Sequence, residues 1–199
     1  MKKTRVGIFG GTFNPPHIGH VEAAKAFAEQ MALDELIIMP AFLPPHKSCD
    51  LTVTSNERFE MCKIAFKDVD RATVSDLEIS RGGKSFTYLT LEELKRDDRE
   101  LYFLCGTDMI LTMDMWRNPD IIFSLAEICY IRRENDSETT DLIEKKCDEY
   151  RSIYGASVHP IVADVIEISS SDIRGTDSVA AEYLLPDVLE YVRKKGFYK

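Results

Sequence analysis

Short apolar runs alternate with segments of helical periodicity along this chain, and this alternation limits the fold more than any other feature. The run Glu35–Pro40 (ELIIMP) is apolar at nearly every position, which is typical of a strand buried on both faces of a parallel sheet. Leu101–Cys105 (LYFLC) shows the same pattern. Parallel strands need crossover connections, so strands that alternate with helices predict an α/β fold, a doubly wound parallel sheet with helices on both faces.

The other expected elements follow from local patterns. Thr54 and Glu57 stand three residues apart before apolar helical positions, which predicts a capping box at a helix start. We expect further strands at Thr4–Phe9, Ala72–Ser80, Ile128–Arg132 and Val158–Val162, and helices from Val21 to Met31, Tyr88 to Arg96, Thr140 to Tyr150 and Asp187 to Lys195.

Length, charge and cysteine usage exclude several classes of protein. The 199 residues suit one compact domain, and 34 acidic residues against 25 lysines and arginines give a net charge of -9, which argues against nucleic acid as a partner. No apolar stretch is long enough to span a bilayer, and the first residues do not read as a signal peptide, so no membrane partner is expected. Five cysteines without a C-x-x-C pair fit neither a disulfide framework nor a zinc ribbon. We therefore expect a cytoplasmic protein.

The segment Gly10–His20 (GGTFNPPHIGH), directly after the first expected strand, has the composition of an anion-binding loop. Paired glycines let main-chain N–H groups approach an anion closely. His17 and His20 stand three apart at a helix start, beside its unpaired N–H groups and positive dipole end. The pattern indicates a cradle for phosphate. Paired histidines can also bind a metal, but no third ligand with zinc-like spacing is nearby, so no metal site is predicted.

A second candidate anion site is Ile168–Arg174 (ISSSDIR). Its hydroxyls and the N–H groups of a helix start can hydrogen-bond phosphate oxygens, and Arg174 adds a fixed charge one turn on. A serine run is also common as a simple helix cap or linker, so this segment alone does not decide the matter.

The first loop resembles the Gly-x-Phe-x-Pro-x-His-x-Gly-His signature of the nucleotidyltransferase superfamily, in which two histidines hold a triphosphate while a substrate phosphate attacks its α-phosphorus. Class I aminoacyl-tRNA synthetases share the letters His-Ile-Gly-His. Their second motif is a Lys-Met-Ser-Lys-Ser segment, however, whereas this chain has Ile168–Arg174, which matches the second nucleotide motif of the superfamily. The resemblance implies a single Rossmann-like nucleotidyltransferase domain, 1–199, whose part from about residue 165 to 199 carries the second motif and the closing helices. The fixed signature positions are matched by Gly11, Phe13, Pro15, His17, Gly19 and His20.

Further segments make the resemblance closest to the bacterial nicotinate-nucleotide adenylyltransferases, over essentially the whole chain. This family joins ATP and nicotinate mononucleotide into nicotinate adenine dinucleotide and pyrophosphate, the step before amidation to NAD. The segments are Pro44–Lys47, Ser85–Leu89, Gly106–Asp108, Trp116, Arg132, Tyr183–Pro186 and Gly196–Tyr198.

The resemblance also implies roles for individual residues. Trp116 suits stacking on a pyridine ring, although the apolar residues before it also fit core packing. Lys47 suits a phosphate partner, whereas an arbitrary surface lysine would only be solvated, and the role of His46 stays open. The implied catalytic residues are His17, His20, Arg174 and Lys47; the ATP contacts are Gly10, Gly11, Thr12, Phe13, Gly19, Gly106, Asp108, Ile168, Ser169, Ser170 and Arg174; and the nicotinate mononucleotide contacts are Asn14, Lys47, Thr87, Trp116 and Arg132.

Two positions depart from the superfamily pattern. Asn14 stands where many members have Asp, but it still offers a hydrogen-bonding side chain. Arg133-Glu134 stand where Pro-Gly often follows the arginine, which leaves open how the loop after Arg132 shapes the adenine pocket.

We expect in-line adenylyl transfer without a covalent enzyme intermediate, because these loops carry no activated nucleophile and the substrate phosphate already is one. Positioning and charge stabilisation would then supply the catalysis, with Mg²⁺ carried on ATP as the cofactor. Alternative acceptors are nicotinamide mononucleotide and phosphopantetheine, and the alternative of another class is a non-catalytic nucleotide sensor. A homo-oligomer is compatible with the sequence, which does not fix the oligomeric state.

Overall fold

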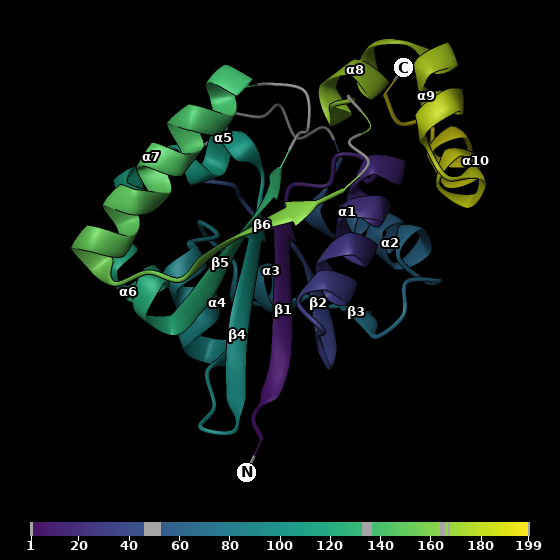
Figure 1. The fold of residues 1–199 in the computed structure, drawn as a ribbon. Helices are drawn as coiled ribbons and strands as arrows, with labels where there is room; N and C mark the ends of the chain where they lie inside the picture. Colours follow the sequence, from purple (N-terminus) through teal and green to yellow (C-terminus); the bar gives the residue numbers. More distant parts are fainter. Residues whose placement is uncertain (1, 46–52, 133–136, 164–165, 167, 199) are drawn as a thin grey trace.

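The computed structural model describes residues 2–45, 53–132, 137–163, 166 and 168–198. Among these residues, six strands form one parallel sheet with the spatial order β3-β2-β1-β4-β5-β6. Helices cover both of its faces (Figure 1). The predicted doubly wound α/β fold is therefore confirmed. The strands are β1 (Thr4–Gly11), β2 (Glu35–Pro40), β3 (Ala72–Val74), β4 (Arg99–Cys105), β5 (Ala126–Arg132) and β6 (Val158–Val162).

The helices divide into two groups, which lie on opposite sides of the sheet. In Figure 1, α1, α2 and the C-terminal helices lie on one side, and α4, α6 and α7 lie on the other. The helical elements are α1 (Ile18–Gln30), α2 (Ser55–Ala65), α3 (Leu77–Arg81), α4 (Thr87–Leu94), α5 (Thr107–Ile110), the 3₁₀ turn η1 (Met113–Met115), α6 (Pro119–Leu125), α7 (Ser137–Tyr154), α8 (Ser170–Gly175), α9 (Asp177–Tyr183) and α10 (Pro186–Lys195).

Two hydrophobic cores result from the alternation of side chains along each strand. In β2, Leu36 and Ile38 enter the core beneath α1 and α2, whereas Ile37 and Met39 enter the core beneath α4 and α6. All four are buried. Successive strand residues point to opposite faces, so a strand covered on both sides must be apolar throughout. This explains the continuous apolar run by which β2 was predicted.

Most of the expected elements are confirmed, and some with their bounds. The strands β2 and β6 begin and end at the predicted residues. The capping box of α2 is present, since Thr54 accepts from the N–H of Glu57 and its own N–H donates to the Glu57 carboxylate. The helix α7 is longer than expected, and α6 and α9 were not expected.

The predicted strand Ala72–Ser80 is wrong beyond Val74. The N–H of Ser75 makes the last bond to β2, at the carbonyl of Ile38, and the chain then turns into the short helix α3. In that turn the Ser75 hydroxyl accepts from the N–H of Leu77, and the N–H of Ser80 donates to the carbonyl of Asp76. Side-chain acceptors that compete with sheet bonds favour such turns, and apolar alternation over a few residues does not exclude one helical turn.

Gly7 allows α1 to approach the central strand closely. A Cβ at this position would lie 2.3 Å from Cδ1 of Leu33 and 2.8 Å from Cε1 of Phe27, and both of these side chains are fully buried. The glycine thus fixes the depth at which α1 packs on β1. It also fixes where the loop that joins them emerges.

We predict that Gly7→Ala lowers the free energy of unfolding by roughly 1–3 kcal/mol, because an extra methyl group overpacks a filled core. Urea denaturation followed by circular dichroism measures this change. Gly175→Ala is the control, since no heavy atom lies within 4 Å of a Cβ built there. Equal unfolding midpoints for the two variants would contradict the proposed close approach.

Candidate active site

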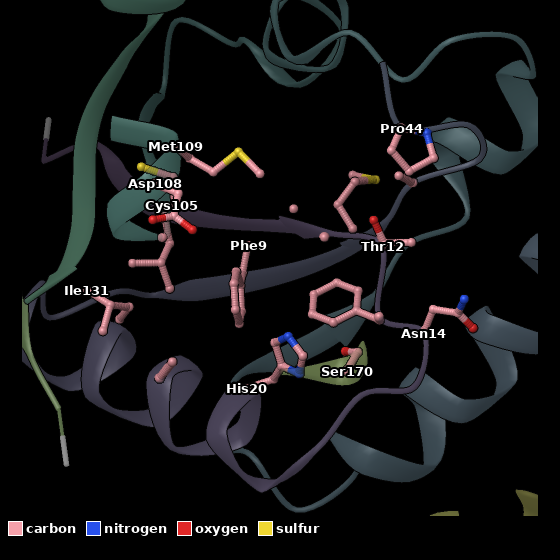
Figure 2. Close-up of a pocket in the computed structure, with 18 of the residues that line it drawn as sticks. Phe9, Thr12, Asn14, His20, Pro44, Cys105, Asp108, Met109, Ile131 and Ser170 are labelled. Carbon is pink, nitrogen blue, oxygen red and sulfur yellow. The ribbon is translucent and has the colours of Figure 1, made fainter. Parts of the chain in front are cut away.

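The strand order places a crevice at the carboxyl ends of β1 and β4. These two strands are neighbours, and the chain leaves them in opposite directions, to β2 on one side and β5 on the other. Ligands of doubly wound sheets bind at such a switch point. A cavity of about 1150 Å³ lies there. Figure 2 shows Cys105, Asp108 and Met109 on one side of Phe9, and Thr12, Asn14 and Ser170 on the other.

The loop between β1 and α1 is shaped by aromatic packing. The ring of Phe13 meets the rings of Phe9, His20 and Phe66 edge to face, at centroid distances of 5.4, 5.1 and 5.7 Å. A Cβ on Gly11 would lie 2.8 Å from this ring, so only glycine fits beside it. The signature positions Gly11 and Phe13 therefore depend on one another.

His17 and His20 lie next to each other at the start of α1. Their ring centroids are 3.7 Å apart, and the N–H of His17 donates to Nδ1 of His20 at 3.2 Å. Gly19 leaves room for this arrangement, since a Cβ there would lie 3.1 Å from Nδ1 of His17. Both rings line the cavity. The structure thus brings the two predicted histidines together.

Burial determines the charge of His17. The side chain is only 6% exposed, and its Nδ1 has no hydrogen-bond partner in the described part of the chain. Burial lowers the pKa of His17 from its usual 6.5 to about 4. At neutral pH the imidazole is therefore neutral without a ligand. It can offer a hydrogen bond to phosphate, and a bound anion would favour its protonation.

The second motif, Ile168–Arg174, is hydrogen-bonded to the first loop. Ser169 caps α8 in a capping box with Asp172, as its hydroxyl accepts from the N–H of that residue. The Ser170 hydroxyl then donates to the carbonyl of Pro15 at 2.9 Å. Arg174 donates to the carbonyl of Asn14 at 2.6 Å and to the Ser171 hydroxyl at 3.0 Å. Two segments separated by about 150 residues of chain thus form one wall of the cavity.

Arg58, which the sequence reasoning missed, lies beneath two of the loops. This fully buried side chain of α2 donates to the carbonyls of Thr12 and Ala41, both at 2.6 Å, and to the carbonyl of Phe42 at 3.1 Å. A buried charge is tolerated when it is hydrogen-bonded in this way. The sequence gives no signal for this role, because the partners are main-chain atoms of distant loops.

The residues predicted to surround the pyridine ring lie on the face of the sheet opposite to α1. Thr87 begins α4 there, and Trp116 packs its ring edge to face against Phe103 at 6.2 Å. Ser85 joins the neighbouring loops, because its N–H donates to the carbonyl of Leu43 and its hydroxyl accepts from the N–H of Phe42. Trp116 is half-buried and lines the cavity, so its ring packs on the core and also forms part of the cavity wall.

A buried polar cluster lies next to this region and was also missed. Glu78 accepts from the Thr90 hydroxyl at 2.6 Å, and Arg81 donates to that hydroxyl at 3.0 Å. Arg81 also pairs with Glu93 at 2.8 Å. Glu78 and Thr90 line the cavity, and neither belongs to a pattern that the sequence alone marks as functional.

The cavity wall contains nearly all of the predicted site residues. Lys47 and His46 lie outside the described residues, and so does the side chain of Arg132, whose main chain is in β5. The described part of the chain holds no group of three or more histidine, cysteine, aspartate or glutamate side chains that could bind a metal ion. The predicted residues that line the cavity are Gly10, Gly11, Thr12, Phe13, Asn14, His17, Gly19, His20, Thr87, Gly106, Asp108, Trp116, Ile168, Ser169, Ser170 and Arg174.

Comparison with known proteins agrees with this geometry. A family model described as cytidylyltransferase-like matches residues 8–176. A Clostridium botulinum protein is 34% identical over 198 residues, and one from Lachnoclostridium phytofermentans is 35% identical over 199. Each alignment covers 98% of both chains, and both relatives are named "probable nicotinate-nucleotide adenylyltransferase".

The fold also matches a solved structure titled Plasmodium falciparum nicotinic acid mononucleotide adenylyltransferase complexed with NaAD. The TM-score is 0.75 at 18% identity, over 98% of this chain and 97% of the other. The solved structure thus shares the fold of this chain, and the family model and the full-length relatives identify its class as the nucleotidyltransferases. The chain belongs to the cytidylyltransferase-like family and, within it, to the nicotinate-nucleotide adenylyltransferases.

We predict that stability falls in acid because His17 is held neutral. Between pH 6.5 and about 4 the unfolded chain binds a proton that the folded chain does not, so the free energy of unfolding falls as the pH falls through this window. The loss from this group is on the order of 3 kcal/mol. Urea denaturation of the wild type and of His17→Gln across this range measures it. The wild type should lose more stability than His17→Gln as the pH falls through this window, and parallel curves would contradict the buried neutral state.

We predict that Arg58→Met lowers the free energy of unfolding by roughly 2–4 kcal/mol, because three main-chain carbonyls lose their donors. Arg96→Met is the matched control. The wild-type Arg96 side chain also donates to main-chain carbonyls, those of Glu93 and Lys95, but at an exposed site. Chemical denaturation of both variants should therefore show a large change only for Arg58→Met. A loss as small as that of the control would exclude the proposed role beneath the loops.

Proposed function

We propose that this chain transfers the adenylyl group of ATP to nicotinate mononucleotide, which yields nicotinate adenine dinucleotide and pyrophosphate for NAD biosynthesis. One observation carries the proposal: the two loops predicted to bind anions are joined at the switch point of the sheet by hydrogen bonds from Arg174 to the carbonyl of Asn14 and from Ser170 to the carbonyl of Pro15. The names of the full-length relatives support the substrates.

The cavity supports a site for two substrates. Its volume, about 1150 Å³, exceeds the roughly 300–1,000 Å³ usual for one small ligand. In our proposal ATP lies between Gly106–Asp108 and the second motif, with its phosphates at His17, His20 and Arg174. The acceptor lies toward Asn14, Thr87 and Trp116. Lys47 and Arg132 remain proposed contacts to phosphate and acceptor.

The proposed reaction is one in-line displacement. An oxygen of the acceptor phosphate forms a bond to the α-phosphorus, the bond from that phosphorus to the bridging oxygen breaks, and pyrophosphate takes the electron pair. The chain positions both phosphates and stabilises the charge on the leaving group. Neutral His17 supplies a hydrogen bond, and Arg174 supplies a fixed charge.

No protein nucleophile is needed for this step. Among the described residues, Cys105 is the thiol that lines the cavity, and its burial raises the pKa well above the usual value. Such a thiol stays protonated and is a poor nucleophile. The acceptor phosphate is already charged, so direct attack is the simpler chemistry.

Magnesium fits this site as a partner of ATP. Within the described part of the chain, the cavity offers only Asp108 and Glu78 as carboxylates, and Glu78 already accepts from Thr90. The chain would therefore hold Mg²⁺ mainly through bound ATP, and the ion would supply positive charge that offsets the triphosphate. The residues of the chain would hold the rest of the nucleotide.

The cytoplasm is the proposed location. The four cysteines in the described residues are free and buried, which suits a reducing compartment. None of the described helices has the length and apolar character needed to cross a membrane.

We predict strong turnover with Mg-ATP and nicotinate mononucleotide, and a fall of orders of magnitude in kcat for His17→Ala and for His20→Ala. His159→Ala is the control, because His159 pairs with Glu127 rather than lining the cavity. Release of pyrophosphate and formation of the dinucleotide measure the rates. Parallel reactions with nicotinamide mononucleotide and phosphopantetheine test the acceptor.

The outcomes separate the alternatives. Equal use of nicotinamide mononucleotide would keep the chemistry and overturn the acceptor. Binding of ATP without pyrophosphate release from any mixture would favour a nucleotide sensor. An ordinary rate in either cavity variant would remove the proposed role of that histidine.

A further inference from the structure

The segment after α10 reaches back to the first loop. The hydroxyl of Tyr198 donates to the side-chain Oδ1 of Asn14 at 2.6 Å, across 184 positions of sequence. Gly196 ends α10 in the left-handed region with φ of 70°, and Tyr198 has φ of 59°. A bulky residue seldom adopts positive φ, so this conformation is maintained by its surroundings.

The ring of Tyr198 packs against one aromatic neighbour, which itself packs against a residue of α10. Phe197 lies between Tyr191 and Tyr198, with centroid distances of 6.1 Å to each. Tyr198 also lines the cavity. A packed segment therefore presents its hydroxyl to the loop.

Asn14 is the residue of the loop that receives this contact. It is 3% exposed, and it lies three positions before His17. Its main-chain carbonyl accepts from Arg174 at 2.6 Å, while its side-chain oxygen accepts from Tyr198. In Figure 2 the amide of Asn14 points away from His20. Two groups of the C-terminal part thus hold both oxygens of one residue.

We propose that Tyr198 is a positioning residue for adenylyl transfer: by holding the side chain of Asn14, it fixes the loop that presents His17 and His20 to the phosphates. The inference rests on the proposed function for its readout. It adds to that function a residue that neither loop signature contains.

The chemistry of the pair supports this direction of the hydrogen bond. Burial raises the pKa of Tyr198 above its usual value, so the phenol keeps its proton and donates. The acceptor is then Oδ1, which fixes the orientation of the Asn14 amide. Loss of the hydroxyl would leave a buried oxygen without its donor and allow the loop to shift. Small displacements of positioning groups reduce the rate strongly.

The first test compares Tyr198→Phe with Tyr191→Phe. Both changes keep the ring, but the Tyr191 hydroxyl makes no hydrogen bond with the described residues, and this residue is outside the cavity wall. We expect Tyr198→Phe to lower kcat about tenfold with less than a threefold change in the KM for ATP, because the loop is misplaced in the transition state. Tyr191→Phe should stay within twofold of the wild type.

The second test asks whether Tyr198 acts through Asn14. The variant Asn14→Leu has a similar shape but no acceptor, whereas Asn14→Asp keeps an acceptor for the phenol. We expect Tyr198→Phe to lower kcat when it is added to Asn14→Asp, but to change kcat less than twofold when it is added to Asn14→Leu. Such non-additivity is the signature of a direct coupling. A role limited to general stability would give the same loss in every background.

Several results would overturn the inference. They are a kcat within twofold of the wild type for Tyr198→Phe, an equal loss when this change is added to Asn14→Leu, or a fall in kcat fully explained by unfolding in a urea titration of the same sample. If Tyr198→Phe does not fold, the Asn14 variants decide alone, and equal rates for Asn14→Leu and Asn14→Asp would overturn the inference. Wild-type turnover in the same assay tests the proposed function separately, since only the ratios between variants test Tyr198.

Discussion

The loop between β1 and α1 keeps its shape because side chains from distant elements donate hydrogen bonds to its carbonyl groups. Arg58 of α2 donates to the carbonyl of Thr12, Arg174 of α8 donates to that of Asn14, and Ser170 donates to that of Pro15. Buried carbonyls need donors, and an irregular loop cannot supply them from its own main chain. The shape of this loop therefore depends on three hydrogen bonds from distant parts of the chain, and the fold brings them together at the switch point of the sheet.

In this arrangement the fixed positive charge and the neutral hydrogen-bonding group belong to different residues. Arg174 is a fixed, partly buried cation in the cavity wall, whereas His17 is buried, with a pKa lowered to about 4. A neutral imidazole next to His20 adds no buried charge to the site. A phosphate would then meet a preformed hydrogen-bonding surface and favour protonation of the ring by its own charge. Binding and charge stabilisation would thus increase together.

The sequence predicts the sheet and the two loops because each of them has a local cause. Apolar runs mark β2 and β4. The signature positions Gly11 and Gly19 leave room for the rings of Phe13 and His17, so these positions have a structural reason. The strand expected over Ala72–Ser80 failed beyond Val74, because the side-chain hydrogen bonds of a turn outweighed a short apolar alternation. Arg58, Glu78 and Tyr198 could not be predicted, since their partners are brought near only by the tertiary fold.

The central claim is that both nucleotides react directly in one cavity at the carboxyl ends of β1 and β4. The most direct measurement uses ATP in which sulfur replaces one α-phosphate oxygen, so that the α-phosphorus is chiral, as a single stereoisomer. It determines the configuration of that phosphorus in the dinucleotide. A single in-line transfer predicts inversion. Retention would indicate two displacements and an adenylylated enzyme, and it would contradict the account.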